Sequence, residues 1–352
     1  MKNVVIDFSE LDNFCGFGDI ARNYAPQLAH LESPDLHFIF MVPDDKVGAY
    51  GTGVDYISMD HPREDLQRLG LKVDLWHATD QLYHYRMTGK DIIQVLTIHD
   101  LNFLYEKRQR VSRWKHLFRL WMKIRQSDAL TFISQFAYNE VNDHYNLSKK
   151  TTRVIYNGIT PLNKVKAVQP VFVKDKDEKF FFTIGQIRRK KNFHTLVPMM
   201  KYFPDYHLYI CGDKQHPQYV KDIEQAIQDA APDRIQLTGR ISAENKKWLF
   251  EHCQGFLFPS LLEGFGIPVL EAMSLGAKVF SSRLTSLPEV CGRHAYYFDD
   301  FVPEHMAHVV EAGLRDHNRL LIDEEKAHAR SFDYDSYVAE YIALYRKLLK
   351  LS

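Results

Sequence analysis

Short apolar runs alternate with amphipathic stretches along almost the whole of this chain. The runs are rich in Val, Ile, Leu and Phe, as are strands that are buried on both faces. The stretches between them carry apolar residues at helical spacing. Parallel strands need a crossover between each pair, and that crossover is usually a helix. The alternation therefore predicts an α/β fold built on parallel sheets.

The pattern places the elements as follows. We expect strands at 3–8, 36–42, 54–58, 73–78, 92–97, 128–133 and 152–156, and then at 179–184, 206–211, 233–238, 254–258, 277–281 and 295–298. We expect helices at 18–31, 61–70, 111–126 and 135–146, then at 192–202, 217–230, 242–252 and 267–275, and finally at 334–350.

A polar break near residue 160 divides the pattern into two similar halves. Asn157-Gly158 follows the last strand of the first half, and the charged run 174–179 precedes the first strand of the second half. A chain of 352 residues is long enough for two domains. We therefore expect one Rossmann-like domain over 1–160 and another over 161–333, with ligands at the carboxyl ends of the strands.

Composition excludes several classes of protein. Lys and Arg number 45 and are balanced by 45 Asp and Glu, so bulk charge gives no reason to expect nucleic-acid binding. No C-x-x-C joins the four cysteines, which favours a reducing cytoplasm over a disulfide framework or a zinc site. The first strand is expected from Asn3, which leaves no room for a signal peptide, and no run of about 18 apolar residues predicts a transmembrane helix.

Two carboxylates in the segment 258–290 point most directly to function. Glu263 is expected in the loop after a strand, and Glu271 one turn into the following helix, whose first turn accommodates Pro268. The unpaired N–H groups of that helix end favour a phosphate. Two hydroxyl-binding carboxylates beside a phosphate site suit a nucleotide sugar. The plainer interpretation is a helix with two solvated acids.

A basic turn at 183–193 suits the same ligand. A strand is expected to end at Gly185 and a helix to open near Asn192, which is a good N-cap residue. The cations between them would offset the charge that develops on a diphosphate leaving group. They are Arg188, Arg189, Lys190 and Lys191. A solvated basic turn is the alternative.

Both segments resemble the retaining glycosyltransferases of family 4. The first resembles their Glu-x7-Glu signature and continues through P-V-L-E-A-M-S-L-G and S-L-P-E-V, and the second resembles their Gly-x4-(Arg/Lys)-Lys-Asn segment. The resemblance implies a GT-B fold, in which two Rossmann-like domains face each other across a cleft. It also implies that the first domain binds the acceptor and the second the nucleotide-sugar donor. The terminal stretch 334–352 would return to complete the first domain.

The resemblance also implies roles for individual residues. Glu271 would bind the ribose hydroxyls, and Glu263 the hydroxyls of the donor sugar. Lys191 would hold the diphosphate together with Lys190 or Arg188, a choice left open because Gln186 stands where many members have arginine. The further donor contacts would be backbone N–H groups of Phe265, Gly266 and Ile267. Catalysis would need no metal and no cofactor, and would retain the anomeric configuration.

Two segments of the first half complete the predicted site. The stretch from Cys15 to Arg22 resembles the family's glycine-rich loop, so Gly16 and Gly18 are expected near the donor phosphates. A dinucleotide fingerprint would fit the same letters, but the loop between Phe8 and the first glycine is long for one. His99 lies in T-I-H-D-L, which resembles the mannosyltransferase-like members and implies a place at the donor sugar. A structural histidine is the alternative.

Two charged segments have plainer interpretations. Asp175-Lys176-Asp177 spells D-x-D, a metal–nucleotide motif of another glycosyltransferase fold, but it lies in the charged break and is expected to be solvated linker. The stretch 107–125 combines eight basic residues and no acid with aromatics at helical spacing. Such a helix can contact an anionic membrane surface, but an ordinary helix with a solvated basic face is the favoured interpretation.

These observations together predict a cytoplasmic, metal-independent, retaining glycosyltransferase. The T-I-H-D-L and S-L-P-E-V segments favour GDP-mannose as donor, with a UDP-sugar close behind. The acceptor would be a glycan or a lipid-linked glycan, in bacterial polysaccharide or lipopolysaccharide assembly by analogy. The rival interpretations are a nucleotide-sugar epimerase or phosphorylase on the same scaffold, and a non-catalytic binder of nucleotide sugars.

Overall fold

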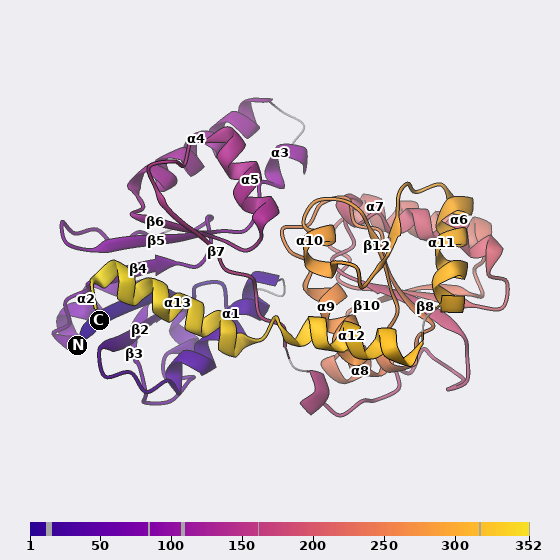
Figure 1. Ribbon diagram of the computed structural model, residues 1–352, viewed down its shortest axis with the longest axis horizontal. Helices are drawn as coiled ribbons and strands as arrows, with labels where there is room; N and C mark the ends of the chain where they lie inside the picture. The colour runs from indigo at the N-terminus through magenta and orange to yellow at the C-terminus, as the bar shows by residue number, and fades with distance from the viewer. Residues whose placement is uncertain (12–15, 84, 107–109, 161, 317, 352) are drawn as a thin grey trace. The chain divides into compact units, whose positions relative to one another are not determined.

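The computed structural model describes every residue of the chain except 12–15, 84, 107–109, 161, 317 and 352. The chain forms two compact units (Figure 1). The first unit comprises Met1–Gly158 and Phe332–Ser352, and the second comprises Ile159–Ser331.

The first unit is built on a seven-stranded parallel sheet in the order β3-β2-β1-β4-β5-β6-β7. Its strands are β1 (Lys2–Asp7), β2 (Leu36–Val42), β3 (Asp55–Ser58), β4 (Leu75–Ala78), β5 (Ile93–Ile98), β6 (Ala129–Phe132) and β7 (Thr151–Val154). Its helices are α1 (Gly16–Ala29), α2 (Pro62–Leu69), α3 (Phe103–Glu106), α4 (Arg110–Gln126), α5 (Gln135–His144) and α13 (Tyr334–Leu349).

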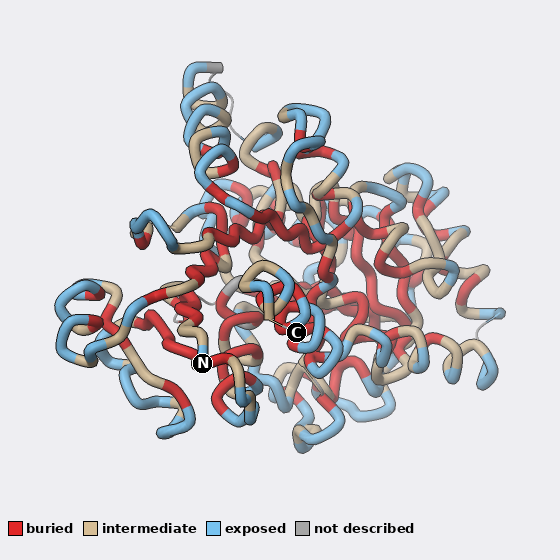
Figure 2. The backbone as a smooth tube through the Cα atoms, turned by 60° about the vertical axis from the view of Figure 1, so that its left-hand side comes forward, coloured by how far each residue is buried: buried red, intermediate tan, exposed pale blue. Residues whose placement is uncertain are grey.

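The second unit contains a six-stranded parallel sheet in the order β10-β9-β8-β11-β12-β13. Its strands are β8 (Phe180–Ile184), β9 (His207–Cys211), β10 (Ile235–Gly239), β11 (Gly255–Phe258), β12 (Val279–Ser282) and β13 (Tyr296–Phe298). Its helices are α6 (Leu196–Met199), α7 (Pro217–Ala230), α8 (Ala243–His252), α9 (Ile267–Leu275), α10 (Leu287–Cys291), α11 (Pro303–Asp316) and α12 (Arg319–Arg330). Most strand residues of both units are buried, and Figure 2 shows the course of the buried segments in red.

The parallel α/β architecture predicted from the sequence is confirmed, and each expected strand is present with ends that differ by at most two residues. The helix expected over 192–202 is wrong. That segment contains short 3-10 turns and the four-residue α6, because Asn192 has a left-handed backbone and Pro198 lacks an N–H. The helices α3, α10, α11 and α12 were not assigned from the sequence.

Helix α13 packs against α1 within the first unit and brings tyrosine hydroxyls to the sheet. The Tyr345 hydroxyl lies 2.6 Å from His77 Nδ1 and 3.1 Å from the Tyr24 hydroxyl. The Tyr341 hydroxyl lies 3.0 Å from Thr97 Oγ1. A buried polar network is stabilising only when its members are satisfied, and this one fixes α13 to β4 and β5.

No helix among the described residues is both long enough and apolar enough to cross a bilayer.

Candidate functional site

The centre of the second sheet is the point where its strand order reverses. From β8 the chain proceeds outward through β9 to β10, and it then returns to β11 on the opposite side of β8. The loops that follow β8 and β11 therefore diverge at the carboxyl ends of two neighbouring strands. Ligands of open α/β sheets bind in the crevice at such a switch point. These are the two loops that carry the basic turn and Glu263.

The loop after β8 is shaped by close contact between backbones. A Cβ at Gly212 would lie 1.7 Å from the carbonyl oxygen of Gly185, so only glycine fits where the ends of β8 and β9 meet. The chain then makes a 3-10 turn over Arg189–Lys191. Asn192, at φ +60°, ends that turn and stands at the N-cap position of the next 3-10 turn, Phe193–Thr195, but its side chain makes no capping hydrogen bond.

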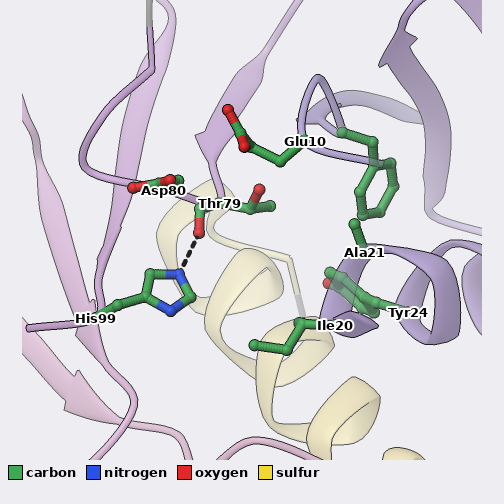
Figure 3. A pocket seen from close by; sticks show the side chains of 8 residues that line it. Glu10, Ile20, Ala21, Tyr24, Thr79, Asp80 and His99 are labelled. Atoms are coloured by element: carbon green, nitrogen blue, oxygen red, sulfur yellow. Dashed lines mark hydrogen bonds between the residues drawn. The ribbon is translucent and has the colours of Figure 1, made fainter. Parts of the chain in front are cut away.

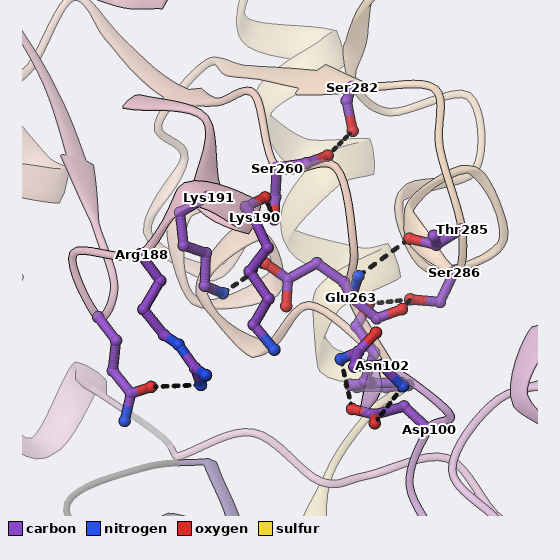
Figure 4. A network of polar contacts seen from close by, with 12 residues as sticks. Asp100, Asn102, Arg188, Lys190, Lys191, Ser260, Glu263, Ser282, Thr285 and Ser286 are labelled. Atoms are coloured by element: carbon purple, nitrogen blue, oxygen red, sulfur yellow. Dashed lines mark hydrogen bonds and ion pairs between the residues drawn. The ribbon is translucent and has the colours of Figure 1, made fainter. Parts of the chain in front are cut away.

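The structure brings Lys191 and Glu263 together although 72 positions separate them in the chain. Lys191 Nζ donates to Glu263 Oε1 at 2.5 Å, and the two side chains are only 13% and 12% exposed (Figure 4). A charge-assisted hydrogen bond between mostly buried groups fixes both side chains in one geometry. An ammonium and a carboxylate are thus held together at the switch point.

Hydrogen bonds tie the loop after β11 to its neighbours (Figure 4). The Lys190 carbonyl oxygen accepts from the Leu261 N–H at 2.7 Å and from Ser260 Oγ at 3.2 Å. The Glu263 N–H donates to Thr285 Oγ1 at 3.1 Å, and Ser286 Oγ donates to the Glu263 carbonyl oxygen at 3.0 Å. These contacts position the Glu263 carboxylate.

The hydroxyls of Thr285 and Ser286 follow β12, so they are far from Glu263 in the sequence. Neither hydroxyl was predicted to have a role. The only signal in the sequence was their place at the start of the S-L-P-E-V segment, which begins at Ser286 and directly follows Thr285.

Helix α9 begins at the second loop. Gly266 precedes it with φ +114°, and a Cβ there would lie 2.7 Å from a methyl of Leu287, so the helix start requires glycine. Pro268 lies in the first turn, as predicted. The N–H groups of this first turn therefore open toward the Glu263 loop, which is the geometry that favours an anion.

Glu271 lies one turn into α9 and is almost fully buried. Lys246 of α8 donates to Glu271 Oε1 at 2.7 Å, and the two side chains are 21% and 5% exposed respectively. A buried carboxylate is costly unless it is paired. Lys246 supplies that partner, which could not be predicted from the sequence because nothing local links α8 to α9.

The other predicted donor residues are distributed around this site. Arg189 is exposed and pairs with Asp222 of α7. Arg188 is half-buried and donates to Gln186 at 3.5 Å. The ring of Phe265 is buried, and its carbonyl oxygen accepts from Ser286. Lys190 and Ile267 are partly exposed.

Asp175 and Asp177 lie in an exposed turn, which agrees with the linker interpretation.

The carboxyl ends of β1, β4 and β5 form a second cluster in the first unit (Figure 3). His99 Nε2 donates to the Thr79 carbonyl oxygen at 2.7 Å, and the His99 N–H donates to Gln81. A carbonyl oxygen only accepts, so Nε2 carries a proton. The small cavity beside it is lined by Phe8, Glu10, Ile20, Ala21, Tyr24, Thr79, Asp80 and His99. His99 therefore lines this cavity.

Buried acids accompany His99. Burial raises the pKa of Asp7 to about 6, and burial raises the pKa of Asp80 as well. Neither acid was predicted from the sequence as part of a site. Gly16 and Gly18 lie in the first turns of α1 rather than in a loop, whereas Cys15 lies outside the described residues. The predicted residues thus gather at the carboxyl ends of the strands in each unit.

Two family models match the chain. The model described as Glycosyltransferase Family 4 matches residues 50–161, and the model described as Glycosyl transferases group 1 matches residues 165–329. The two matched ranges correspond closely to parts of the first and second units.

Curated relatives include enzymes of O-antigen assembly. The chain is 27% identical over 207 residues to the O-antigen chain mannosyltransferase RfbU of Salmonella typhimurium, which covers 58% of this chain and 56% of that protein. It is 30% identical over 216 residues to the serotype-specific mannosyltransferase WbdA of Escherichia coli, with 58% of this chain and 26% of that protein covered. The chain thus matches little more than half of the first relative and about a quarter of the second.

Solved structures share the fold over the whole chain. A sucrose-phosphate synthase of Thermosynechococcus elongatus has a TM-score of 0.74 at 18% identity, and each chain is covered completely. HepE of Anabaena in complex with UDP-glucose has a TM-score of 0.75 at 14% identity, with 99% of this chain and 100% of that chain covered. Both likenesses identify the GT-B class of two parallel-sheet domains.

Proposed function

The chain belongs to the glycosyltransferases of family 4 and group 1, and we propose that it transfers a sugar from a nucleoside diphosphate to a hydroxyl of an acceptor. The observation that carries this proposal is the ion pair of Lys191 and Glu263 beside the first turn of α9. It puts a cation, a hydroxyl-binding carboxylate and a helix N-terminus at one switch point. A nucleotide sugar needs these three groups side by side.

We assign the donor contacts from that geometry. Lys191 and the α9 N–H groups hold the diphosphate, with Lys190 or Arg188 as a second cation. When the phosphate engages Lys191, the Glu263 carboxylate becomes available to the hydroxyls of the sugar. Glu271, held by Lys246, receives the ribose hydroxyls.

The proposed reaction retains the anomeric configuration. The bond between the anomeric carbon and the β-phosphate oxygen breaks, and the acceptor oxygen forms its bond on the same face of the sugar. The acceptor proton passes to the departing phosphate oxygen, so atoms and charge balance. Lys191 and the helix N–H groups stabilise the charge on the diphosphate as it leaves. We place His99 and the glycines Gly16 and Gly18 around the reacting centre.

No metal or cofactor enters this scheme, because Lys191 and the α9 N–H groups supply the charge stabilisation. Activity is therefore expected to survive EDTA. A strict requirement for Mg²⁺ or Mn²⁺ would refute this part of the proposal.

We propose GDP-mannose as the donor and a glycan or lipid-linked glycan as the acceptor. RfbU and WbdA, which the chain resembles, are both named as mannosyltransferases, and RfbU acts on O-antigen chains. A UDP-sugar is the second candidate, since HepE holds UDP-glucose on the same fold. We place the enzyme in the cytoplasm, with peripheral membrane contact. The described cysteines Cys211, Cys253 and Cys291 are free thiols, which fits a reducing compartment.

A thermal-shift panel of GDP, UDP, ADP and dTDP tests the donor first. A nucleotide present at 100 times its dissociation constant adds about 2.7 kcal/mol of stability by mass action. GDP is expected to give the largest shift, and Lys191→Ala is expected to reduce it. No shift with any nucleotide would refute donor binding. Consumption of the nucleotide sugar without any acceptor would favour an epimerase, and binding without turnover would favour a non-catalytic binder.

A further inference from the structure

Helix α4 carries apolar residues on two faces, one buried and one exposed. Leu120 and Ile124 pack into the core of the first unit. The outward face carries a row of large apolar side chains: Val111 (68% exposed), Trp114 (73%), Phe118 (53%) and Trp121 (38%). These positions are three or four residues apart, so they form one stripe about 15 Å long. The Phe118 and Trp121 rings lie 5.6 Å apart, which makes the stripe continuous at that end.

Exposed cations follow the same stripe. Lys115 and Arg119 come one position after Trp114 and Phe118, so they flank it on one side. The Arg125 guanidinium lies 5.4 Å from the centre of the Trp121 ring. The sequence has no acidic residue between 110 and 126. The surface is therefore apolar along its centre and positive along its edge.

Lys123, four positions after Arg119, does not belong to this exposed basic edge. Its ammonium donates to the carbonyl oxygens of Gln81 and Tyr83 at 2.7 and 2.8 Å, and burial lowers its pKa to about 8. Lys123 thus anchors α4 to the loop after β4, and the outward face is left to the aromatic residues.

We propose that this outward face, the α4 stripe of Val111, Trp114, Lys115, Phe118, Arg119 and Trp121, docks the first unit on an anionic lipid bilayer. A helix of this kind lies parallel to the membrane, with its apolar side chains at the boundary between headgroups and acyl chains. Tryptophan is suited to that boundary. The cations meet the lipid phosphates.

Charge complementarity favours lipid over a second copy of this chain. A two-fold interface through the α4 stripe would bring the same patch of both copies together. Lys115 and Arg119 would then approach their own counterparts without an acid on either helix. An anionic lipid surface instead offers a counter-charge for each cation. The inference depends on α4 alone and holds for any donor sugar.

Vesicle binding by the 352-residue chain tests the inference. Vesicles of phosphatidylcholine with 40% phosphatidylglycerol are expected to sediment the protein at about 50 mM salt, and pure phosphatidylcholine vesicles are not. Raising the salt to about 500 mM should release the protein, because screening shortens the reach of the cations. Brominated lipids should quench tryptophan fluorescence through Trp114 and Trp121, since Trp76 and Trp248 are buried. Absence of sedimentation on the anionic vesicles would overturn the proposal.

Paired variants separate the two contributions. Lys115→Gln with Arg119→Gln should weaken binding about 30-fold, at roughly fivefold per charge. Trp114→Ser with Phe118→Ser should weaken it tenfold or more and reduce the quenching of Trp121, the remaining exposed tryptophan. The matched control is Lys90→Gln with Lys149→Gln, two exposed lysines elsewhere on the first unit, which should bind normally.

Two outcomes of these variants would contradict the inference. If the Lys90→Gln, Lys149→Gln control lost as much vesicle affinity as the Lys115→Gln, Arg119→Gln variant, net charge alone would drive binding. If Trp114→Ser with Phe118→Ser instead converted a dimer into a monomer in size-exclusion chromatography without lipid, the α4 stripe would be a contact between copies. Unchanged nucleotide thermal shifts in every variant would establish that the second unit remains intact. A loss of vesicle binding is thereby distinguishable from a failure of the donor site.

Discussion

Removing Lys246 should expose how strongly the second unit depends on a paired Glu271. The carboxylate is 5% exposed and its partner ammonium lies 2.7 Å away. Deleting one partner of a buried ion pair typically costs about 3–5 kcal/mol, because the remaining charge is left in a poorly solvating environment. Lys246 is 21% exposed, so water can partly replace it, and we expect the lower end, about 3 kcal/mol, for Lys246→Ala.

Calorimetry and urea unfolding measure this cost. For a domain of this size, about 3 kcal/mol corresponds to a fall in Tm of roughly 6–12 °C. Adding Glu271→Gln to Lys246→Ala removes the stranded charge, so the double variant should recover about 2 kcal/mol. The matched control is Arg293→Ala, because Arg293 pairs with Glu324 at 3.2 Å on an exposed surface. Exposed pairs contribute about 1 kcal/mol or less.

Two results would refute this reasoning. One is a cost for Lys246→Ala no larger than that of Arg293→Ala. The other is a double variant no more stable than Lys246→Ala alone, since the penalty would then come from lost packing of the lysine stem rather than from the stranded carboxylate.

Three further perturbations follow from the structure. Burial lowers the pKa of His77 to about 3, so between pH 6.5 and 3 the unfolded chain binds a proton at this residue that the folded chain does not. Urea unfolding should therefore show the free energy of unfolding falling as the pH drops from 6.5 toward 3, and falling less steeply in His77→Gln. Equal slopes in the two proteins would contradict this role of His77. Gly266→Ala should cost about 1–3 kcal/mol, because φ is +114° and the new Cβ meets a leucine methyl at 2.7 Å. Gly70→Ala, at φ +66° with no atom within 4 Å, should melt closer to wild type. Lys191→Ala should slow sugar transfer by roughly 30- to 1000-fold, whereas Arg189→Ala on the same turn should be near normal; similar rates for both would remove Lys191 from the mechanism.

The sequence alone determined the architecture of both units. Strands buried on both faces are recognisable locally as apolar β-branched and aromatic runs, and the helical stretches between them require parallel pairing. For the same reason Glu263 and Glu271 could be placed on a loop and on the following helix, because strand, loop and helix are contiguous there. The prediction of one helix over 192–202 was wrong, because the left-handed backbone of Asn192 and the internal Pro198 interrupt a segment whose apolar residues have helical spacing.

Only the tertiary structure decided which groups meet and which faces remain exposed. Lys191 reaches Glu263 because β8 and β11 are neighbours at the switch point, and Lys246 reaches Glu271 because α8 packs on α9. Neither contact leaves a local trace in the sequence. On α4, the spacing of apolar residues identified a helix but could not say that Leu120 is covered and Trp114 is not. Periodicity records that a face is apolar, whereas burial depends on what the rest of the chain places against it.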